Sequence, residues 1–129
     1  MAFTLDHTSG NSLTFDDSTP AKTVTGWAPI SAGAGAFFDY VNIQLSIAFG
    51  NAADGNATIK CRVSADGGTT DSDQAIDLNS VAYTVSTTKI ITVRLEKFNY
   101  AEIGVYNGNS AAQDITLSGS WEGLKITDS

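Results

Sequence analysis

The feature that most constrains the fold is a strict alternation of apolar and polar residues in the middle of the chain. Val41, Ile43, Leu45, Ile47 and Phe49 are apolar, and the residues between them are small or polar. Successive side chains of a β-strand point to opposite sides of a sheet, so a period of two is typical of a strand with one buried face. The segment therefore predicts a half-buried strand, and no part of the chain repeats apolar residues convincingly at helical spacing.

Similar runs follow along the chain, separated by residues that favour turns. We expect three hairpins, which join residues 41–49 to 59–65, 81–85 to 90–95, and 100–106 to 115–121. About eight to ten short strands with regular turns predict an all-β, single-domain antiparallel β-sandwich, either a jelly roll or an immunoglobulin-like fold.

The first third of the chain is patterned more weakly than the rest. Pro20 and the small residues from Ser31 to Ala36 interrupt any regular element. We therefore expect a loosely structured N-terminal arm with short strands over residues 1–36, followed by the sandwich core over residues 37–129. No repeat or linker marks a second domain in the 129 residues.

The charge of the chain excludes several classes of partner. It has 14 acidic and 7 basic side chains, which gives a formal net charge of −7. Such a surface repels phosphate backbones and anionic lipid, so we expect neither nucleic acid nor a membrane as a partner. The N-terminus lacks the features of a signal peptide, and the single cysteine cannot form an intrachain disulfide, so we expect synthesis in a reducing cytosol.

Few residues in the sequence suit catalysis. His7 lies in the weakly patterned segment, where no rigid scaffold would hold a partner for it. Cys61 is in phase with Ile59 and Val63 on an apolar strand face, where a thiol behaves as a small hydrophobe with a raised pKa. Nothing pairs two carboxylates across a cleft, and no glycine-rich phosphate loop is present. We therefore expect no enzymatic activity and no cofactor.

A cluster of aspartates is the one feature that suggests a metal. Asp66, Asp71, Asp73 and Asp77 lie in and beside a glycine-rich loop, and carboxylates are the ligands that Ca²⁺ prefers. No glutamate closes a twelve-residue calcium loop, and two glycines follow Asp66 directly. A solvated turn is thus the favoured interpretation, and a calcium site is the alternative.

Tyrosines and arginines on polar strand faces indicate a protein contact. Tyr100 and Tyr106 alternate with buried-type residues, and Arg62 and Arg94 lie mid-strand. Exposed aromatic and arginine side chains are enriched in protein interfaces. Ordinary cross-strand pairing of arginine with glutamate is the alternative.

The aromatic residues also suggest a second kind of binding. A set of tryptophans and tyrosines could form a stacking platform for sugars, as in carbohydrate-binding sandwiches. Trp121 continues the period-two pattern of Ile115 and Leu117, so we expect it in the core instead.

Three segments of the chain resemble small β-sandwich virion proteins of tailed bacteriophages. They are VSADGGTT at 63–70, FNYAEIGVYN at 98–107 and DITLSGSW at 114–121. They lie in the stretch 41–121, which is about two-thirds of the chain. The resemblance implies a non-enzymatic protein of the virion, and it carries no set of functional residues with it.

Within that group, the resemblance favours a capsid decoration (cement) protein that docks on the assembled head. Such proteins are often single small acidic β-domains with a loosely patterned arm. Its partners would be the major capsid protein lattice or other virion proteins, and it could form a homo-oligomer such as a trimer. A tail or baseplate accessory protein is the alternative, although those proteins usually add coiled coils, stalks or further domains.

Overall fold

The computed structural model describes residues 3–13, 15, 22–24, 27–64, 76–110 and 115–128. These residues form nine β-strands and no helix, and so hold no helix that could cross a membrane. The strands are β1 (Phe3–Leu13), β2 (Thr23–Val24), β3 (Ala28–Ser31), β4 (Ala36–Phe49), β5 (Ala57–Ser64), β6 (Ile76–Val81), β7 (Thr88–Phe98), β8 (Tyr100–Asn107) and β9 (Ile115–Asp128).

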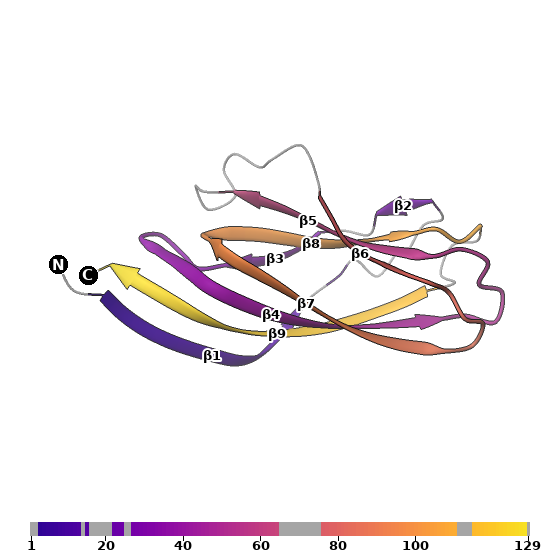
Figure 1. Cartoon of the computed structure of the whole chain (residues 1–129), viewed down its shortest axis with the longest axis horizontal. Coiled ribbons are helices and arrows are strands. Elements are labelled where there is room, and N and C mark those ends of the chain that lie inside the picture. The colour runs from indigo at the N-terminus through magenta and orange to yellow at the C-terminus, as the bar shows by residue number, and fades with distance from the viewer. Residues whose placement is uncertain are drawn as a thin grey trace.

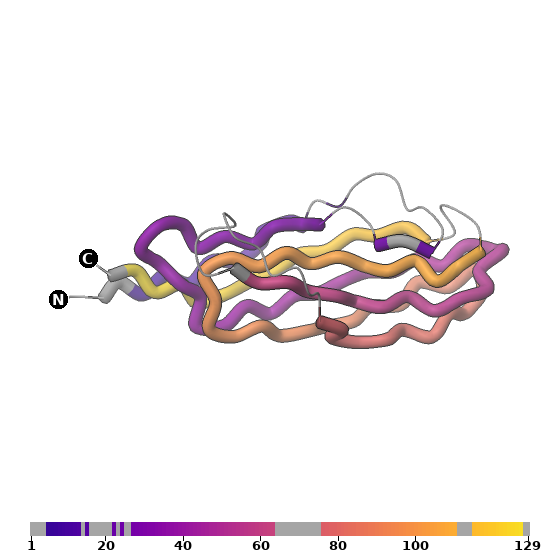
Figure 2. The backbone as a smooth tube through the Cα atoms, turned by 90° about the horizontal axis from the view of Figure 1, so that it is seen from above, coloured from indigo at the N-terminus to yellow at the C-terminus, as the bar shows by residue number. Residues whose placement is uncertain are grey.

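The strands form two antiparallel sheets that lie face to face (Figure 1). The four-stranded sheet has the order β1-β9-β4-β7. The five-stranded sheet has the order β2-β8-β5-β6, and β3 also pairs with β8. Figure 2 shows the strands of both layers running along the long axis, with both termini at one end. The predicted all-β antiparallel sandwich is confirmed.

Strand pairing is nested from the ends of the chain towards its middle. β1 pairs with β9, β2 and β3 pair with β8, β4 pairs with β7, and β5 pairs with β6. The chain is therefore one long antiparallel ribbon folded over on itself. Two further pairings, β4 with β9 and β5 with β8, join parts of this ribbon side by side into the sheets.

The prediction of three hairpins is wrong. β4 and β5 lie in different sheets, and so do β6 and β7, and β8 and β9. The three turn-rich segments cross from one layer to the other, and the hydrogen bonds of each strand go to strands that are distant in sequence. Alternation shows which side of a strand is buried, but both sheets bury a face against the same core, so the pattern does not show which sheet a strand joins.

These crossing segments are tied to one another at the end of the sandwich away from the termini. Asn109 is fully buried, and its Oδ1 accepts hydrogen bonds from the backbone N–H groups of Asp54 (2.7 Å) and Gly55 (3.0 Å). Gly55 lies so close to the backbone of Gly108 that a Cβ atom would come within 2.0 Å of its carbonyl oxygen. Asparagine and glycine in these segments therefore join the two layers rather than close hairpins.

The core lies between the sheets and is built from alternate residues of facing strands. In β4, Val41, Ile43, Leu45 and Ile47 are fully buried, as the alternation predicts. β5 and β8 contribute Ile59, Cys61, Ala101, Ile103 and Val105, which are also fully buried. Trp121 is partly buried and packs edge-on against Phe38, with ring centroids 5.4 Å apart, so its predicted place in the core is confirmed.

The N-terminal segment is more regular than the expected loose arm, within the part that the structure describes. β1 pairs with β9 over most of its 11 residues, with an irregularity between Thr8 and Asn11 where Gly10 has a φ of 73°. Among the described side chains of β1, Leu13 is the buried one. A strand that is held mainly by backbone hydrogen bonds needs few apolar side chains, so its sequence shows little alternation of apolar and polar residues. For this reason the sequence did not reveal β1. The division between residues 36 and 37 stays a prediction.

Candidate interaction surfaces

The outer face of the five-stranded sheet carries a closed cluster of Trp27, Arg62 and Glu102. The guanidinium carbon of Arg62 lies 4.4 Å from the centre of the Trp27 ring. Arg62 Nε donates a hydrogen bond to Glu102 Oε1 at 2.9 Å, and the two residues are direct cross-strand neighbours on β5 and β8. Their side chains are only 29% and 12% exposed. We call these three residues the tryptophan clasp.

A glycine beneath the tryptophan clasp makes room for the indole ring. A Cβ atom on Gly104 would lie 2.9 Å from Trp27 Cε3 and 2.7 Å from Val24 Cγ1. Both distances are shorter than normal carbon contacts, so only glycine at this position of β8 allows the segment before β3 to lie on the sheet. The tryptophan clasp therefore fastens part of the N-terminal segment to the sandwich.

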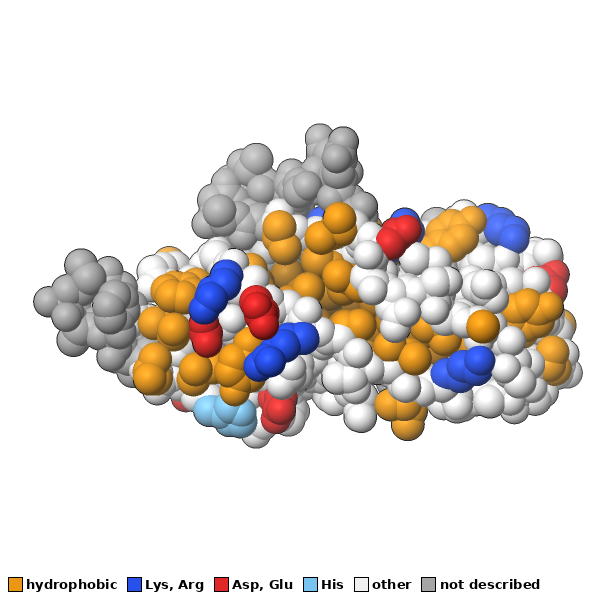
Figure 3. All heavy atoms as spheres, in the orientation of Figure 1, with side chains coloured by type: hydrophobic (Ala, Val, Ile, Leu, Met, Phe, Trp, Pro, Cys, Tyr) orange, Lys and Arg blue, Asp and Glu red, His pale blue; other side chains and the backbone are white. Residues whose placement is uncertain are grey.

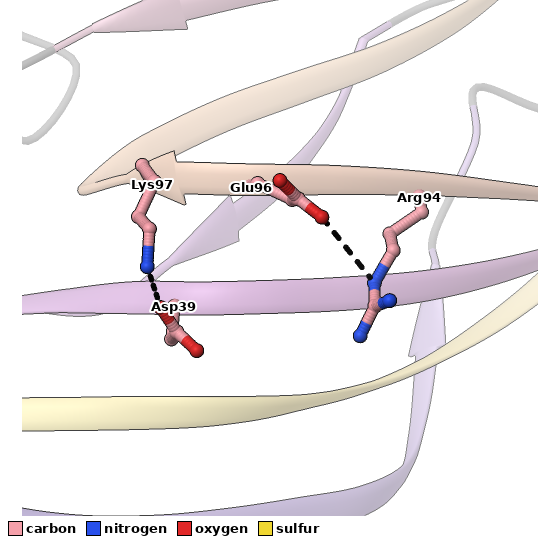
Figure 4. A network of polar contacts seen from close by, with 4 residues as sticks. All are labelled: Asp39, Arg94, Glu96 and Lys97. Atoms are coloured by element: carbon pink, nitrogen blue, oxygen red, sulfur yellow. Dashed lines mark hydrogen bonds and ion pairs between the residues drawn. The ribbon is translucent and has the colours of Figure 1, made fainter.

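The outer face of the four-stranded sheet carries an open version of the same arrangement, formed by Tyr40, Arg94 and Glu96. The guanidinium carbon of Arg94 lies 4.4 Å from the centre of the Tyr40 ring. Arg94 Nε and Glu96 Oε1 are 3.9 Å apart, and the two side chains are 52% and 62% exposed (Figure 4). We call these three residues the tyrosine cluster. Its charged groups remain accessible to a partner.

A second ion pair lies beside the tyrosine cluster. Lys97, the next-to-last residue of β7, points to Asp39 on β4 and forms an ion pair with its carboxylate (Figure 4). Lys97 has a φ of 55°, and its side chain is 69% exposed. Positive and negative side chains thus alternate along this edge of the four-stranded sheet.

Exposed apolar side chains gather at the same end of the four-stranded sheet. Leu5 is 65% exposed and Phe37 is 38% exposed, and both pair in register with Ile126. The next row across the sheet pairs Leu124 with Tyr40. We call Leu5, Phe37, Tyr40, Leu124 and Ile126 the end patch. Figure 3 shows hydrophobic side chains at the end where the termini lie, with basic and acidic side chains among them.

The middle of the four-stranded sheet is a shallow polar depression. It has a volume of about 290 Å³ and is lined by Asn42, Gln44, Thr92, Ser120 and Glu122 among others. A second hollow of about 230 Å³ continues it along the strands and shares Gln44 and Ser120. Amide and hydroxyl side chains therefore line the centre of this face.

The predicted contact residues do not form one surface. Arg62, Tyr100 and Tyr106 share the outer face of the five-stranded sheet, whereas Arg94 lies on the opposite side of the molecule. Both tyrosines are half-buried, and Tyr106 is the register neighbour of Val24 and of Thr58. Arg62 pairs with a glutamate across the strands, the alternative that the sequence left open.

The structure describes three of the six residues that the sequence singled out for chemistry, namely Cys61, His7 and Asp77. Cys61 is fully buried on the inner side of β5, and this burial raises the pKa of its thiol. The His7 side chain is about half exposed on β1, with its Nε2 at 4.0 Å from Glu122 Oε2. Of the four aspartates, Asp66, Asp71 and Asp73 lie outside the described residues. Asp77 is exposed and pairs with Lys60, whose Nζ donates a hydrogen bond to it at 2.6 Å. The described residues hold no cluster of metal-binding side chains.

Sequence reasoning missed the end patch. Leu5 lies in the segment expected to be a loose arm, and Phe37 lies next to the small residues that end it. The one available signal was Leu124 and Ile126, which are two residues apart and so share a strand face. Their neighbours across the sheet depend on the pairing of β9 with β1 and β4, which the sequence did not reveal.

No known family model and no curated protein matches the sequence. The chain aligns over 97% of its length with a chain of the T13 IBDV viral particle, at 12% identity and a TM-score of 0.44. It also aligns over 97% of its length with a chain of the T=1 particles derived from infectious bursal virus, at 11% identity and a TM-score of 0.43. The chain spans 31% of the length of each of these. Both scores lie below 0.5, so we draw no functional argument from them.

Proposed function

We propose that this chain is a non-enzymatic structural protein of a bacteriophage virion, built as a jelly roll, which decorates the assembled head. The nested strand pairing carries the proposal. If β2 and β3 are counted as one interrupted strand, eight strands form a ribbon whose first strand pairs with its last and whose middle strands pair with each other. That order matches a jelly roll, an architecture found in viral capsid and lectin domains.

Two groups that could support catalysis are placed unfavourably for it. The Cys61 thiol is fully buried and its pKa is raised, so the reactive thiolate is disfavoured at neutral pH. His7 is exposed on the edge strand β1, and its Nε2 lies 4.0 Å from Glu122 Oε2, beyond hydrogen-bond distance. Both observations support a binding role over an enzymatic one.

Binding to virion parts tests the proposal directly. Purified protein is co-sedimented with heads and, separately, with tails of the phage that encodes it, and the bound copies are counted. Saturation at many copies per head, in proportion to the lattice, is the expected result. Binding only to tails, or at a few copies per particle, would assign the protein to the tail, baseplate or a vertex. Binding to neither would overturn the virion role.

Two matched variants show which face docks. Arg94→Ala removes a predicted contact residue from the four-stranded sheet, and Tyr106→Ala removes one from the five-stranded sheet. The variant whose saturation falls identifies the docking face, provided that its urea unfolding curve shows a folded protein. If both variants bind heads as the unmodified protein does, neither residue belongs to the docking face.

The polar depression favours one other function, a carbohydrate-binding module. Asn42, Gln44 and Thr92 offer amide and hydroxyl groups of the kind that bind sugar hydroxyls. However, Arg62 lies over the Trp27 ring and Arg94 lies over the Tyr40 ring, each with its guanidinium carbon 4.4 Å from the ring centre. One face of each ring is therefore already occupied. A glycan that shifts the tryptophan fluorescence of the protein, but not that of Gln44→Ala, would establish this function instead.

A further inference from the structure

We propose that the end patch is a self-association surface, on which a second copy of this chain sits about a two-fold axis. Leu5, Ile126 and Phe37 form one row across three neighbouring strands, and Leu124 and Tyr40 form the next row. Side chains opposite one another on neighbouring strands have Cβ atoms about 5 Å apart, so the two rows form a continuous surface. Leu5 and Phe37 are exposed and the other three are partly buried, and contiguous accessible apolar surface of this kind is typical of interaction sites.

The distribution of charge indicates that the partner is another copy. The strands of the four-stranded sheet contain four basic and five acidic residues, a net charge of −1. The described residues outside these strands contain three basic and three acidic residues, a net charge of 0. The four-stranded sheet is itself nearly neutral, so two copies can bring these sheets together with little repulsion. A strongly charged partner would find little net charge to bind on this face.

The charged groups around the end patch also suit two-fold symmetry. A two-fold interface brings a patch against its own image, so it must carry both members of every complementary pair. Asp39 with Lys97 and Arg94 with Glu96 place both signs beside the apolar rows. Each copy can therefore offer an opposite charge to the charges of the other.

A comparison of two matched variants tests self-association. Sedimentation velocity is measured on the unmodified protein, on the double variant Leu5→Ser/Phe37→Ser, and on Ile90→Ser as the control. Ile90 is 64% exposed, close to the 65% of Leu5, and lies on the same sheet face opposite Ser46. Its neighbour Ser46 is about 20 Å along β4 from Tyr40, the nearest residue of the end patch on that strand, at roughly 3.3 Å per residue. The control therefore removes an equally exposed apolar side chain from outside the proposed surface.

The unmodified protein is expected to dimerise at about 10–100 μM, and Ile90→Ser is expected to do the same. The double variant should raise the dimer dissociation constant by at least about 100-fold, because a two-fold interface loses each apolar side chain twice. An unmodified protein that stays monomeric at about 1 mM would overturn the proposal. A control variant that dissociates as readily as the double variant would also overturn it. Circular dichroism shows whether each variant is folded.

Salt dependence provides a second test that does not depend on the apolar residues. Arg94→Glu replaces a positive charge with a negative one beside the end patch, which makes each copy two units more negative, so we expect dimers about tenfold weaker at low salt. Salt at about 0.5 M should restore their affinity, because it screens exposed charges. The double apolar variant should not be restored. Equal dimerisation of Arg94→Glu and the unmodified protein at low salt would contradict a partner surface that contains Arg94.

Self-association and docking on the virion fail independently of each other. Dimers that do not bind heads or tails would support the end patch as a self-association surface and overturn the virion role. A protein that stays monomeric and saturates heads would support the virion role and overturn self-association through the end patch. Self-association through the end patch goes beyond virion docking, since it concerns two copies of this chain in solution.

Discussion

The two outer faces of the sandwich carry the same three kinds of side chain in different states. In the tryptophan clasp, the arginine and glutamate are 2.9 Å apart and mostly buried. In the tyrosine cluster, the corresponding atoms are 3.9 Å apart and more than half of each side chain is exposed. The distance from guanidinium to ring centre is 4.4 Å in both. Similar residues thus hold the fold together on one face and remain available to a partner on the other.

The cause of this difference lies in what covers each face. On the five-stranded sheet, the segment around Trp27 lies across β8 at Gly104 and shields Arg62 from water. On the four-stranded sheet, Tyr40 belongs to the sheet itself, and Arg94 covers its ring from the solvent side. Shielding strengthens an ion pair and makes the loss of one member costly, whereas an exposed pair contributes little to folding.

The largest expected effect comes from removing the two aromatic rings in turn. We expect Trp27→Ala to lower the free energy of unfolding by about 3 kcal/mol, because it empties the space above Gly104 and exposes the Arg62–Glu102 pair. Tyr40→Ala should lower it by about 1 kcal/mol, because its ring lies on an open face. Urea unfolding followed by circular dichroism measures both. Equal losses for the two variants would show that the faces do not differ as described.

A smaller difference is expected from the two arginines. Arg62→Ala leaves the 12%-exposed carboxylate of Glu102 without its partner, so we expect a loss of about 2 kcal/mol. Arg94→Ala should cost less than about 0.5 kcal/mol, because the charges of its ion pair are already hydrated. Double-mutant cycles with Glu102→Gln and Glu96→Gln isolate each pair. A coupling energy at Arg94–Glu96 as large as that at Arg62–Glu102 would contradict the assignment of a closed and an open face.

The sequence predicted the strands better than their partners. The alternation from Val41 to Phe49 located a strand of the core correctly, because burial of every second side chain leaves a trace in the residue types. The pairing of β4 with β7 and β9 leaves no such trace, since it depends on backbone hydrogen bonds between segments far apart in the chain. The three expected hairpins were therefore wrong although their strands were largely right.

The candidate surfaces depend on which strands pair with each other, which the pattern of residue types does not show. Arg62 and Arg94 both lie mid-strand among residues that alternate, so nothing in the pattern of residues places them on opposite faces. Their positions follow from the assignment of β5 and β7 to different sheets. The end patch depends in the same way on the pairing of β1 with β9, and β1 has little apolar pattern of its own.

The smallest expected effect is a pH dependence that arises from one residue of the five-stranded sheet. Cys61 lies on the inner side of β5, where burial raises the pKa of its thiol above the ordinary value of 9.0. A raised pKa means that the thiol contributes its full stability below about pH 9 and that this contribution is lost as the pH rises further. The slope reaches at most about 1.4 kcal/mol per pH unit for one proton. We expect the free energy of unfolding to fall with this slope above pH 9, and Cys61→Ala to remove that part of the fall.

The same thiol reports which face opens first, because it is the single cysteine of the chain. Arg62→Ala weakens the sheet that carries Cys61, so labelling of the thiol by a soluble disulfide reagent should become about 30-fold faster if local opening of this sheet limits the reaction. Arg94→Ala alters the opposite face and should leave the rate within about two-fold of the unmodified protein. An opening free energy, taken from the labelling rate relative to that of a free thiol, that equals the free energy of unfolding in urea would mean that Cys61 reacts only after global unfolding. In that case the tryptophan clasp would stabilise the whole sandwich rather than its own sheet, and the two faces would differ in exposure but not in cooperativity.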